Sequence, residues 1–493
     1  MKGATSSYDK SRVFLVISVT TLANLLTGFA ARLAVVGMPT ISHDIRANVW
    51  EMVWIIQGYM LGSTFIQLIV GRLADLYGRV KLFNIGILVF TLGALLSGLS
   101  SSPSALIFSR ILQGVGGAFL ISLSIAILAD NIPSNMLGKW LGINQVTWRV
   151  GALMGLTLSG FIVDYMGWRW IFLIQVPIGT VALIWSYLKL RDVYKPVEKE
   201  EIDWIGFASF TFSITLLLVG LTLLGYGYSS YSYILVFSSI IFLSLFTIVE
   251  LRTKAPALDL RIFKIRQFTG GVIAQLLYSI GFGASLTLLA IYLQSVAGYD
   301  ASTTGLLLTP YELVFLVSGI IGGVLSDMVG FVKITVLGLA AGSLALYVFS
   351  TMNSLRDLMI GEILFGIGTG LFVSPNTASI MSCVPPERRG VASSIRTLSF
   401  NIGFMASLNL AILTITTRIP YEEASQLITL GYVTLSSNVN YELNELTIAI
   451  KRSFLVQSAI MALAIPFSFL RSKRNSLRFP TLGERSILIP GSS

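Results

Sequence analysis

Charged residues are scarce in this chain. Asp, Glu, Lys and Arg together make up only 12% of its 493 residues, against 54% hydrophobic ones. A soluble globular protein carries roughly 25% charged residues to cover its surface. The mean hydropathy of +0.79 points the same way. The composition therefore excludes a soluble globule and predicts an all-α protein that crosses a membrane many times.

Cysteine and histidine are nearly absent as well. The single cysteine, Cys383, excludes an intrachain disulfide, and the single histidine, His43, excludes a histidine-based metal site. The chain also lacks the G-x-x-x-x-G-K-[ST] loop that holds nucleotide phosphates, the H-E-x-x-H zinc motif and the G-x-S-x-G nucleophile elbow. We therefore expect no metal, no cofactor, no bound ATP and no enzyme activity.

Apolar runs of about 20 residues, the length that crosses the hydrocarbon of a bilayer, recur along the whole sequence. Fourteen can be assigned, and the first, Val13 to Met38, is too long for a signal-peptide core. If both termini are cytoplasmic, most of the 34 lysines and arginines fall on the cytoplasmic side, as the positive-inside rule requires. The net charge of +10 then reflects topology rather than binding of nucleic acid. We expect a multi-pass, monomeric protein of the cell membrane.

An internal repeat divides the chain. Tyr59 aligns with Tyr311, 252 residues later, and the same shift carries Gly114 onto Gly366. One constant shift over four predicted helices indicates two six-helix halves with two extra helices between them, and a substrate site between the halves. The predicted parts are a first bundle (1–188), a linker with two extra helices and a basic loop (189–266), a second bundle (267–472) and a cytoplasmic tail (473–493). Residues 416–452 form the longest predicted external loop, to which we assign no role.

A charged stretch, Gly71 to Lys81, lies between the second and third predicted spans. Its first glycine predicts a close approach of helices, and Gly78 predicts a turn. Asp75 has three candidate partners, which are Arg79, Lys81 and an exposed helix N-terminus. We interpret this stretch as a gating hinge, and the alternative is an ion pair that only staples the two halves together. The predicted gating residues are Gly71, Asp75, Gly78, Arg79, Lys81 and Asp327.

The repeat copy of this hinge has lost its cations. Asp75 aligns with Asp327, but Arg72 and Arg79 align with Val324 and Phe331. We therefore predict that the hinge of the first half is electrostatic and that Asp75 matters more than Asp327.

These motifs also carry a family resemblance. Gly71 to Lys81 resembles the loop 2–3 signature of the major facilitator superfamily, and Arg110 to Gly117 resembles its helix-4 signature. Trp168 to Gly179 and Pro256 to Phe263 are similar to stretches of its 14-span drug:proton antiporter branch, the EmrB/QacA-type exporters. The resemblance implies the major facilitator fold and proton-coupled export of small organic compounds or drugs by alternating access.

Two departures from that branch bear on coupling. In the predicted fifth helix Leu156 replaces a proline and Ser159 replaces a glycine, which predicts a straight helix and looser packing. In the first helix the acid of the branch is missing, and Arg32 lies two residues further on.

Ionisable residues inside the predicted spans are the strongest functional signal, because a charge at the bilayer centre costs about 2.5–3.5 kcal/mol or more. Arg32 and Arg110 are predicted at similar depth, where they would favour a ligand with negative charge. The repeat aligns Arg110 with Glu362, and Glu312 follows Pro310 near the midplane. The proton-coupling candidates are Glu312, Glu362 and Arg110. The substrate-cavity candidates are Arg32, Arg110, Gln113 and Arg149. For the arginines, the alternative is a buried cation that satisfies carbonyl groups of neighbouring helices.

The leading hypothesis from the sequence is a proton-coupled exporter whose partners are a small-molecule substrate, protons and the lipid bilayer. The nearest alternative keeps the fold but is an uptake symporter or uniporter for an organic anion or metabolite. A membrane receptor or a lipid-modifying enzyme is a third class. The chain shows no nucleophile and base constellation and no sizeable soluble domain, which argues against both.

Overall fold

The computed structural model describes residues 10–67, 69–132, 134–192, 203–225, 229–253, 258, 260–385, 389–420, 423 and 439–472. Within these ranges every regular element is a helix, as the composition predicts. The first half contributes α1 (Lys10–Ile45), α2 (Val49–Gln67), α3 (Val70–Tyr77), α4 (Arg79–Leu99), α5 (Pro103–Asn131), α6 (Ser134–Met166), α7 (Arg169–Leu173) and α8 (Gln175–Lys189). The inserted pair is α9 (Trp204–Gly225) and α10 (Ser229–Arg252). The second half contributes η1 (Leu260–Lys264), α11 (Arg266–Phe282), α12 (Ser285–Ile291), η2 (Tyr292–Val296), α13 (Ala301–Val329), α14 (Phe331–Thr351), α15 (Leu355–Ser382), α16 (Arg389–Thr416), α18 (Val439–Phe469) and η5 (Leu470–Ser472).

Thirteen stretches of the described residues are long and apolar enough to cross a membrane. One of these stretches consists of α7 and α8 together, and another consists of α11, α12 and η2 together. The remaining predicted span is α2, which has 19 residues and therefore a length of about 28 Å. Trp50, Glu51 and Gln57 reduce its apolar character, and most of it is buried against neighbouring helices. With α2 counted, the prediction of fourteen spans is confirmed.

The repeat is visible in the backbone. Gly78 separates α3 from α4 with φ +96°, and Gly330, 252 residues later, separates α13 from α14 with φ +91°. An L-residue rarely adopts such angles, so both turns require glycine. Ser102 and Ser354, also 252 residues apart, cap the N-termini of α5 and α15 through their hydroxyl groups. The two halves thus share helix boundaries as well as sequence.

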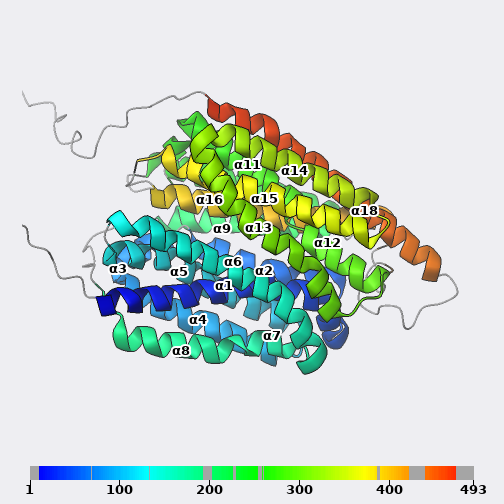
Figure 1. Cartoon of the computed structure of the whole chain (residues 1–493), viewed down its shortest axis with the longest axis horizontal. Coiled ribbons are helices and arrows are strands. Elements are labelled where there is room, and N and C mark those ends of the chain that lie inside the picture. The colour runs from blue at the N-terminus through cyan, green and yellow to red at the C-terminus, as the bar shows by residue number, and fades with distance from the viewer. Residues whose placement is uncertain are drawn as a thin grey trace, which may run out of the picture.

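The two halves form two layers of roughly parallel helices. In Figure 1 the blue and cyan helices of the first half lie below the yellow and red helices of the second half. We call the end of the bundle where α1 ends and α2 begins the distal end, and the opposite end, where α1 begins, the proximal end. The main contacts between the halves join α6 to α13, α2 to α16, and α1 to α12 and α13.

The inserted pair lies beside one of these contacts. Helix α9 packs on both α16 and α2, whereas α10 packs mainly on α9 and exposes most of its apolar side chains. Only 17% of the most apolar window of α10 is buried, which suits a helix that faces lipid.

Candidate functional site

A buried ion pair joins the two halves in the middle of the bundle. Arg32 of α1 lies 3.4 Å from the carboxylate of Glu312 on α13, and their side chains are 5% and 1% exposed. The Arg32 guanidinium also lies 5.3 Å from the ring centroid of Phe282. Two of the predicted residues, which are 280 positions apart in the sequence, are therefore partners. Breaking such a pair on one side leaves an uncompensated buried charge, at a cost of about 3–5 kcal/mol.

Glu362 of α15 lies next to this pair, and no cation of the described residues forms an ion pair with it. It is fully buried, and neither of its carboxylate oxygens accepts a side-chain hydrogen bond from the described residues. It is within electrostatic range of Glu312, and the backbone of Tyr311, the residue before Glu312, lies beside its carboxyl group. Two neighbouring carboxyl groups, with one cation paired to only one of them, form an arrangement that holds a proton.

Arg110 has a different environment, inside the first half. It is 1% exposed, and it donates to the carbonyl groups of Ala30 at 3.0 Å and Ile55 at 3.3 Å. It also donates to Gln113 at 2.5 Å and lies over the ring of Tyr59. The side-chain amide of Gln113 in turn donates a hydrogen bond to the side chain of Gln175 on α8, at 3.1 Å. This network ties α1, α2, α5 and α8 together and supplies acceptors to Arg110 from the protein itself.

Arg149 joins the central cluster from α6. Its guanidinium lies 3.7 Å from the ring centroid of Phe315 on α13 and 5.3 Å from that of Trp148. Its charge interacts with those of Glu312 and Arg32. The structure thus brings Arg32, Arg149, Glu312 and Glu362 into one cluster between the halves, and it places Arg110 and Gln113 in a separate network within the first half.

The predicted gating hinge forms α3 and the turn to α4 at the proximal end. Arg79 pairs with Asp130 of α5 at 2.6 Å, and the amide of Val80 donates to the carboxylate of Asp192 at 2.8 Å. The side chain of Asp75 lies outside the described residues, whereas Lys81 and Asp327 are exposed. A Cβ atom at Gly71 would meet no atom of the described residues within 4 Å. The prediction that this glycine permits a close helix approach is therefore wrong.

The packing of the fifth predicted span, α6, is tight. Its glycines pack against the backbones of neighbouring helices: an added Cβ at Gly151 or Gly155 would lie within 3 Å of the backbone of α1, and one at Gly160 within 3 Å of the backbone of α13. Ser159 is buried and donates to the carbonyl of Leu156 at 3.2 Å. The expectation of looser packing is wrong, because three glycines of the pattern remain and the serine satisfies its own hydroxyl group. The helix runs unbroken from Ser134 to Met166, as the missing proline predicts.

Further hydrogen bonds between the halves were not predicted from the sequence. The strongest cluster lies at the distal end, where Asp164 of α6 accepts from the amide of Ser302 at 2.6 Å and Thr157 pairs with Thr309 at 2.7 Å. The others are Gln294 to the carbonyl of Val36, Gln57 to Asn409 and to the carbonyl of Met405, and Asn401 to Thr64. Among the described residues, each such bond lies within about 23 Å of the distal ends of its helices. In the sequence, the glutamines and asparagines inside apolar runs could have indicated these hydrogen bonds between helices.

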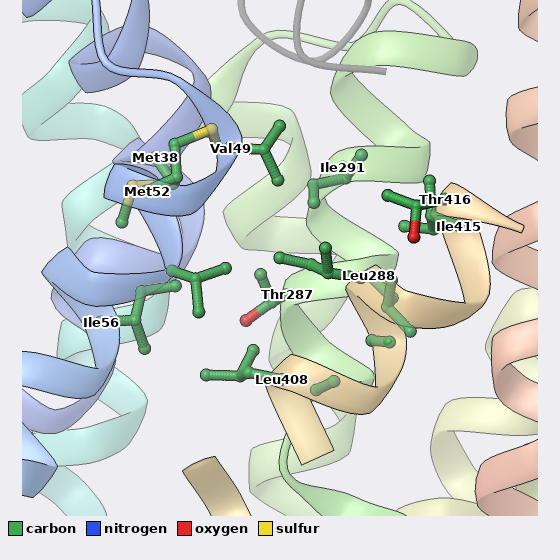
Figure 2. Close-up of a pocket in the computed structure, with 14 residues that line it drawn as sticks. Met38, Val49, Met52, Ile56, Thr287, Leu288, Ile291, Leu408, Ile415 and Thr416 are labelled. Atoms are coloured by element: carbon green, nitrogen blue, oxygen red, sulfur yellow. The ribbon is translucent and has the colours of Figure 1, made fainter. Parts of the chain in front are cut away.

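An apolar cavity lies between the halves on the distal side, with a volume of about 40 Å³. Figure 2 shows Met52 and Ile56 of the first half facing Leu288 and Leu408 of the second half across it. It lies beside the Gln57 to Asn409 contact. Because its lining is apolar, it suits a dry seal better than a site for a charged group. No group of metal-ligating side chains is present among the residues that the structure describes.

Comparisons with known proteins agree with this architecture. The family model described as Major Facilitator Superfamily matches residues 20–408. The riboflavin transporter RibZ of Clostridioides difficile is 31% identical over 402 residues, which cover 79% of this chain and 86% of RibZ. The multidrug export protein EmrB of Escherichia coli is 30% identical over 401 residues, which cover 78% of this chain and 77% of EmrB. A bacterial homologue of the human lysosomal transporter Spinster, solved in an inward-facing and unoccupied conformation, superposes with a TM-score of 0.67 at 15% identity, covering 94% of this chain and 98% of that one.

Proposed function

Because this chain belongs to the major facilitator superfamily, and is therefore a multi-pass secondary transporter of small molecules, we propose that it couples export of an organic compound to inward proton movement. The observation that carries the proposal is the buried cluster of Arg32, Glu312 and Glu362, which contains two carboxyl groups and one ion pair across the halves.

The two carboxyl groups have different roles in this proposal. Arg32 lies 3.4 Å from Glu312, where its positive charge stabilises a carboxylate. Glu362 has no cation and no side-chain donor, so its neutral, protonated form is the one that tolerates burial. The pair therefore shares one proton and can exchange it when the environment of Glu312 changes.

Alternating access follows from where the halves are joined. Hydrogen bonds between described residues of the two halves cluster toward the distal end, so this state is closed distally. When Glu312 takes up the proton, its attraction to Arg32 is lost and the two halves are released from each other. A ligand group that donates to these carboxyl groups competes with the proton that they share, and such competition is the thermodynamic requirement for antiport.

Topology gives the direction of the proton. We propose that the distal end faces the outside and that both termini lie in the cytoplasm of a cell-membrane protein, since basic loops are retained inside. We also propose that the chain acts as a monomer and binds no nucleic acid. The hinge at Arg79 and Asp130 then lies at the cytoplasmic end, where it would hold α4 and α5 as the halves rock.

Export is favoured by the relatives named as multidrug exporters, and EmrB is among them. The relative named as a riboflavin transporter keeps the second candidate open, which is a symporter or uniporter for an organic anion or metabolite. Each candidate predicts a different flux in the same vesicles.

The test begins with a ligand found by its stabilisation of the detergent-solubilised protein, since any compound that binds the folded state raises its unfolding midpoint. That ligand is then followed in proteoliposomes under an imposed pH gradient. Antiport predicts ligand movement against the direction of the proton flow. Movement with the protons, or movement that ignores the gradient, would establish the second candidate instead.

A further inference from the structure

Two arginines from opposite halves lie within electrostatic range of each other, on the proximal side of the central ion pair. Arg149 lies on α6, and Arg396 lies on α16, seven residues from its proximal start at Arg389. The charges of the two side chains repel each other. Both lie further from the distal helix ends than the hydrogen bonds that close the halves. They therefore lie where a space that opens proximally would reach them.

Neither guanidinium has an acceptor in the part of the chain that the structure describes. Among the residues that the structure describes, no hydrogen bond and no ion pair reaches Arg149 or Arg396, and the enclosed Nε of Arg396 has no acceptor at all. Both side chains are half-buried, so part of each stays accessible. A guanidinium carries five N–H donors and stays protonated in proteins. Within a membrane span such a cation is costly unless an anion accompanies it.

The other two buried arginines of the core, Arg110 and Arg32, are compensated by the protein itself. Arg110 has three acceptors from the protein, and Arg32 has Glu312. Arg149 is held by aromatic faces instead, at 3.7 Å from the centroid of Phe315. A stacked guanidinium keeps its in-plane N–H groups free for a planar acceptor such as a carboxylate.

The central cluster also carries excess positive charge. Arg32 and Glu312 neutralise each other, and Glu362 is buried without a cation. Arg149 shares the charge of Glu312 with Arg32, and no carboxylate of the described residues interacts with Arg396. An acidic ligand placed between Arg149 and Arg396 would relieve their repulsion and join the two halves.

We propose that Arg149 and Arg396 form a binding site for the acidic group, a carboxylate or phosphate, of an anionic organic ligand. This inference rests on the proposed transport function in one respect only, which is that the ligand is the transported compound. Phe315 and Trp148 lie beside Arg149, so an aromatic or apolar body attached to the acidic group could contact their rings.

The first test needs no ligand. Replacing both arginines, Arg149→Gln with Arg396→Gln, removes their repulsion and the stacking of Arg149 on Phe315 but no hydrogen bond, so the unfolding midpoint of the detergent-solubilised protein should stay nearly unchanged. Arg110→Gln is the matched control, because it removes three hydrogen bonds from the protein and should lower the midpoint. A loss of stability in the double variant as large as that of the control would overturn the proposal.

The second test measures binding, without a membrane gradient, of three acids: 2-naphthoate, citrate and pyrophosphate. At least one should raise the unfolding midpoint of the wild-type protein, and neutral 2-naphthamide should not. Arg149→Gln and Arg396→Gln should each bind that acid about tenfold more weakly than the wild-type protein does. Arg396→Lys should bind it with an affinity between those of the wild-type protein and Arg396→Gln. No shift with any of the acids, or equal shifts in the wild-type and double-variant proteins, would overturn the site. Flux under a pH gradient is measured separately, so failure here leaves the transport proposal standing, and the reverse also holds.

Discussion

At the scale of single residues, the account depends on how each buried charge is compensated. Arg110 is compensated by backbone carbonyls and a glutamine, and Arg32 by a carboxylate from the other half. Glu362 has neither a hydrogen-bond donor nor a counter-charge among the described side chains, so its neutral form is the one that fits its surroundings. These three environments predict different responses to substitutions of similar size.

The first prediction compares the two carboxyl groups. Glu312→Gln leaves Arg32 buried without a counter-charge and should lower the free energy of unfolding by about 3 kcal/mol. Glu362→Gln replaces a neutral carboxyl group by a neutral amide of similar shape, so the loss should stay below about 1 kcal/mol. Thermal unfolding of the two variants in the same detergent checks this. Equal destabilisation would mean that Glu362 is ionised and paired.

The second prediction concerns the proximal hinge. Arg79 pairs with Asp130, but the repeat copy has Phe331 and Ser382 at the corresponding positions, so the second half lacks this pair. Asp130→Asn should therefore reduce the transport rate more than Asp327→Asn does. Stability should change little in either variant, because a partly exposed ion pair contributes only about 0.2–1 kcal/mol. Equal transport defects would remove the asymmetry between the halves.

At the scale of elements, the contact of α6 with α1 sets how closely the first half packs. The third prediction is that Gly151→Ala lowers the free energy of unfolding by about 1–3 kcal/mol, since the added methyl group would lie within 3 Å of the backbone of Leu25. Gly142→Ala on the same helix is the matched control, because its Cβ would meet no atom within 4 Å. The control should be neutral or more stable than the wild-type protein, since alanine favours a helix.

The inserted helix α9 supports the other contact between the halves. Asn409 of α16 accepts from Gln57 of α2 at 3.1 Å and from Thr222 of α9 at 2.9 Å. One side chain thus links both halves and the insert. The sequence predicted the two extra helices but gave no indication of where they would pack, because their contacts depend on residues almost 200 positions away.

The fourth prediction follows from that link. Thr222→Val keeps the shape of the side chain but removes the hydroxyl donor, so the distal contact of α2 with α16 should open more often. Thr215→Val on the same helix is the control, because Thr215 donates only to Thr211 within α9. Distances between spin labels at the distal ends of α2 and α16 report the change. Identical distance distributions in the two variants would exclude a role of α9 in this contact.

At the scale of the whole molecule, the sequence predicted the fold because periodic features are local. Apolar runs, the 252-residue repeat and the turns at Gly78 and Gly330 can all be recognised without tertiary structure. The site could be predicted only as a set of isolated charges. The pairing of Arg32 with Glu312, the separate network of Arg110 and the position of Arg396 beside Arg149 depend on how two halves dock. No local pattern encodes that docking.

The fifth prediction concerns the distal closure. Asp164 and Ser302 contact each other across the halves, so cysteines at these two positions should form a disulfide that locks the distal end and stops transport until it is reduced. Burial raises the pKa of the native Cys383 thiol to about 11, so that thiol should remain largely unreactive at pH 8. Continued transport in the fully cross-linked protein would show that the distal end need not open.

In the proposed mechanism, ligand and proton compete for the carboxyl groups beside Arg32. The most direct measurement records proton release with an indicator dye when ligand is added to detergent-solubilised protein in weak buffer. The account predicts a release from the wild-type protein that disappears when Glu312→Gln and Glu362→Gln are combined, while the ligand still binds. No release from the wild-type protein, or an undiminished release from the double variant, would contradict it.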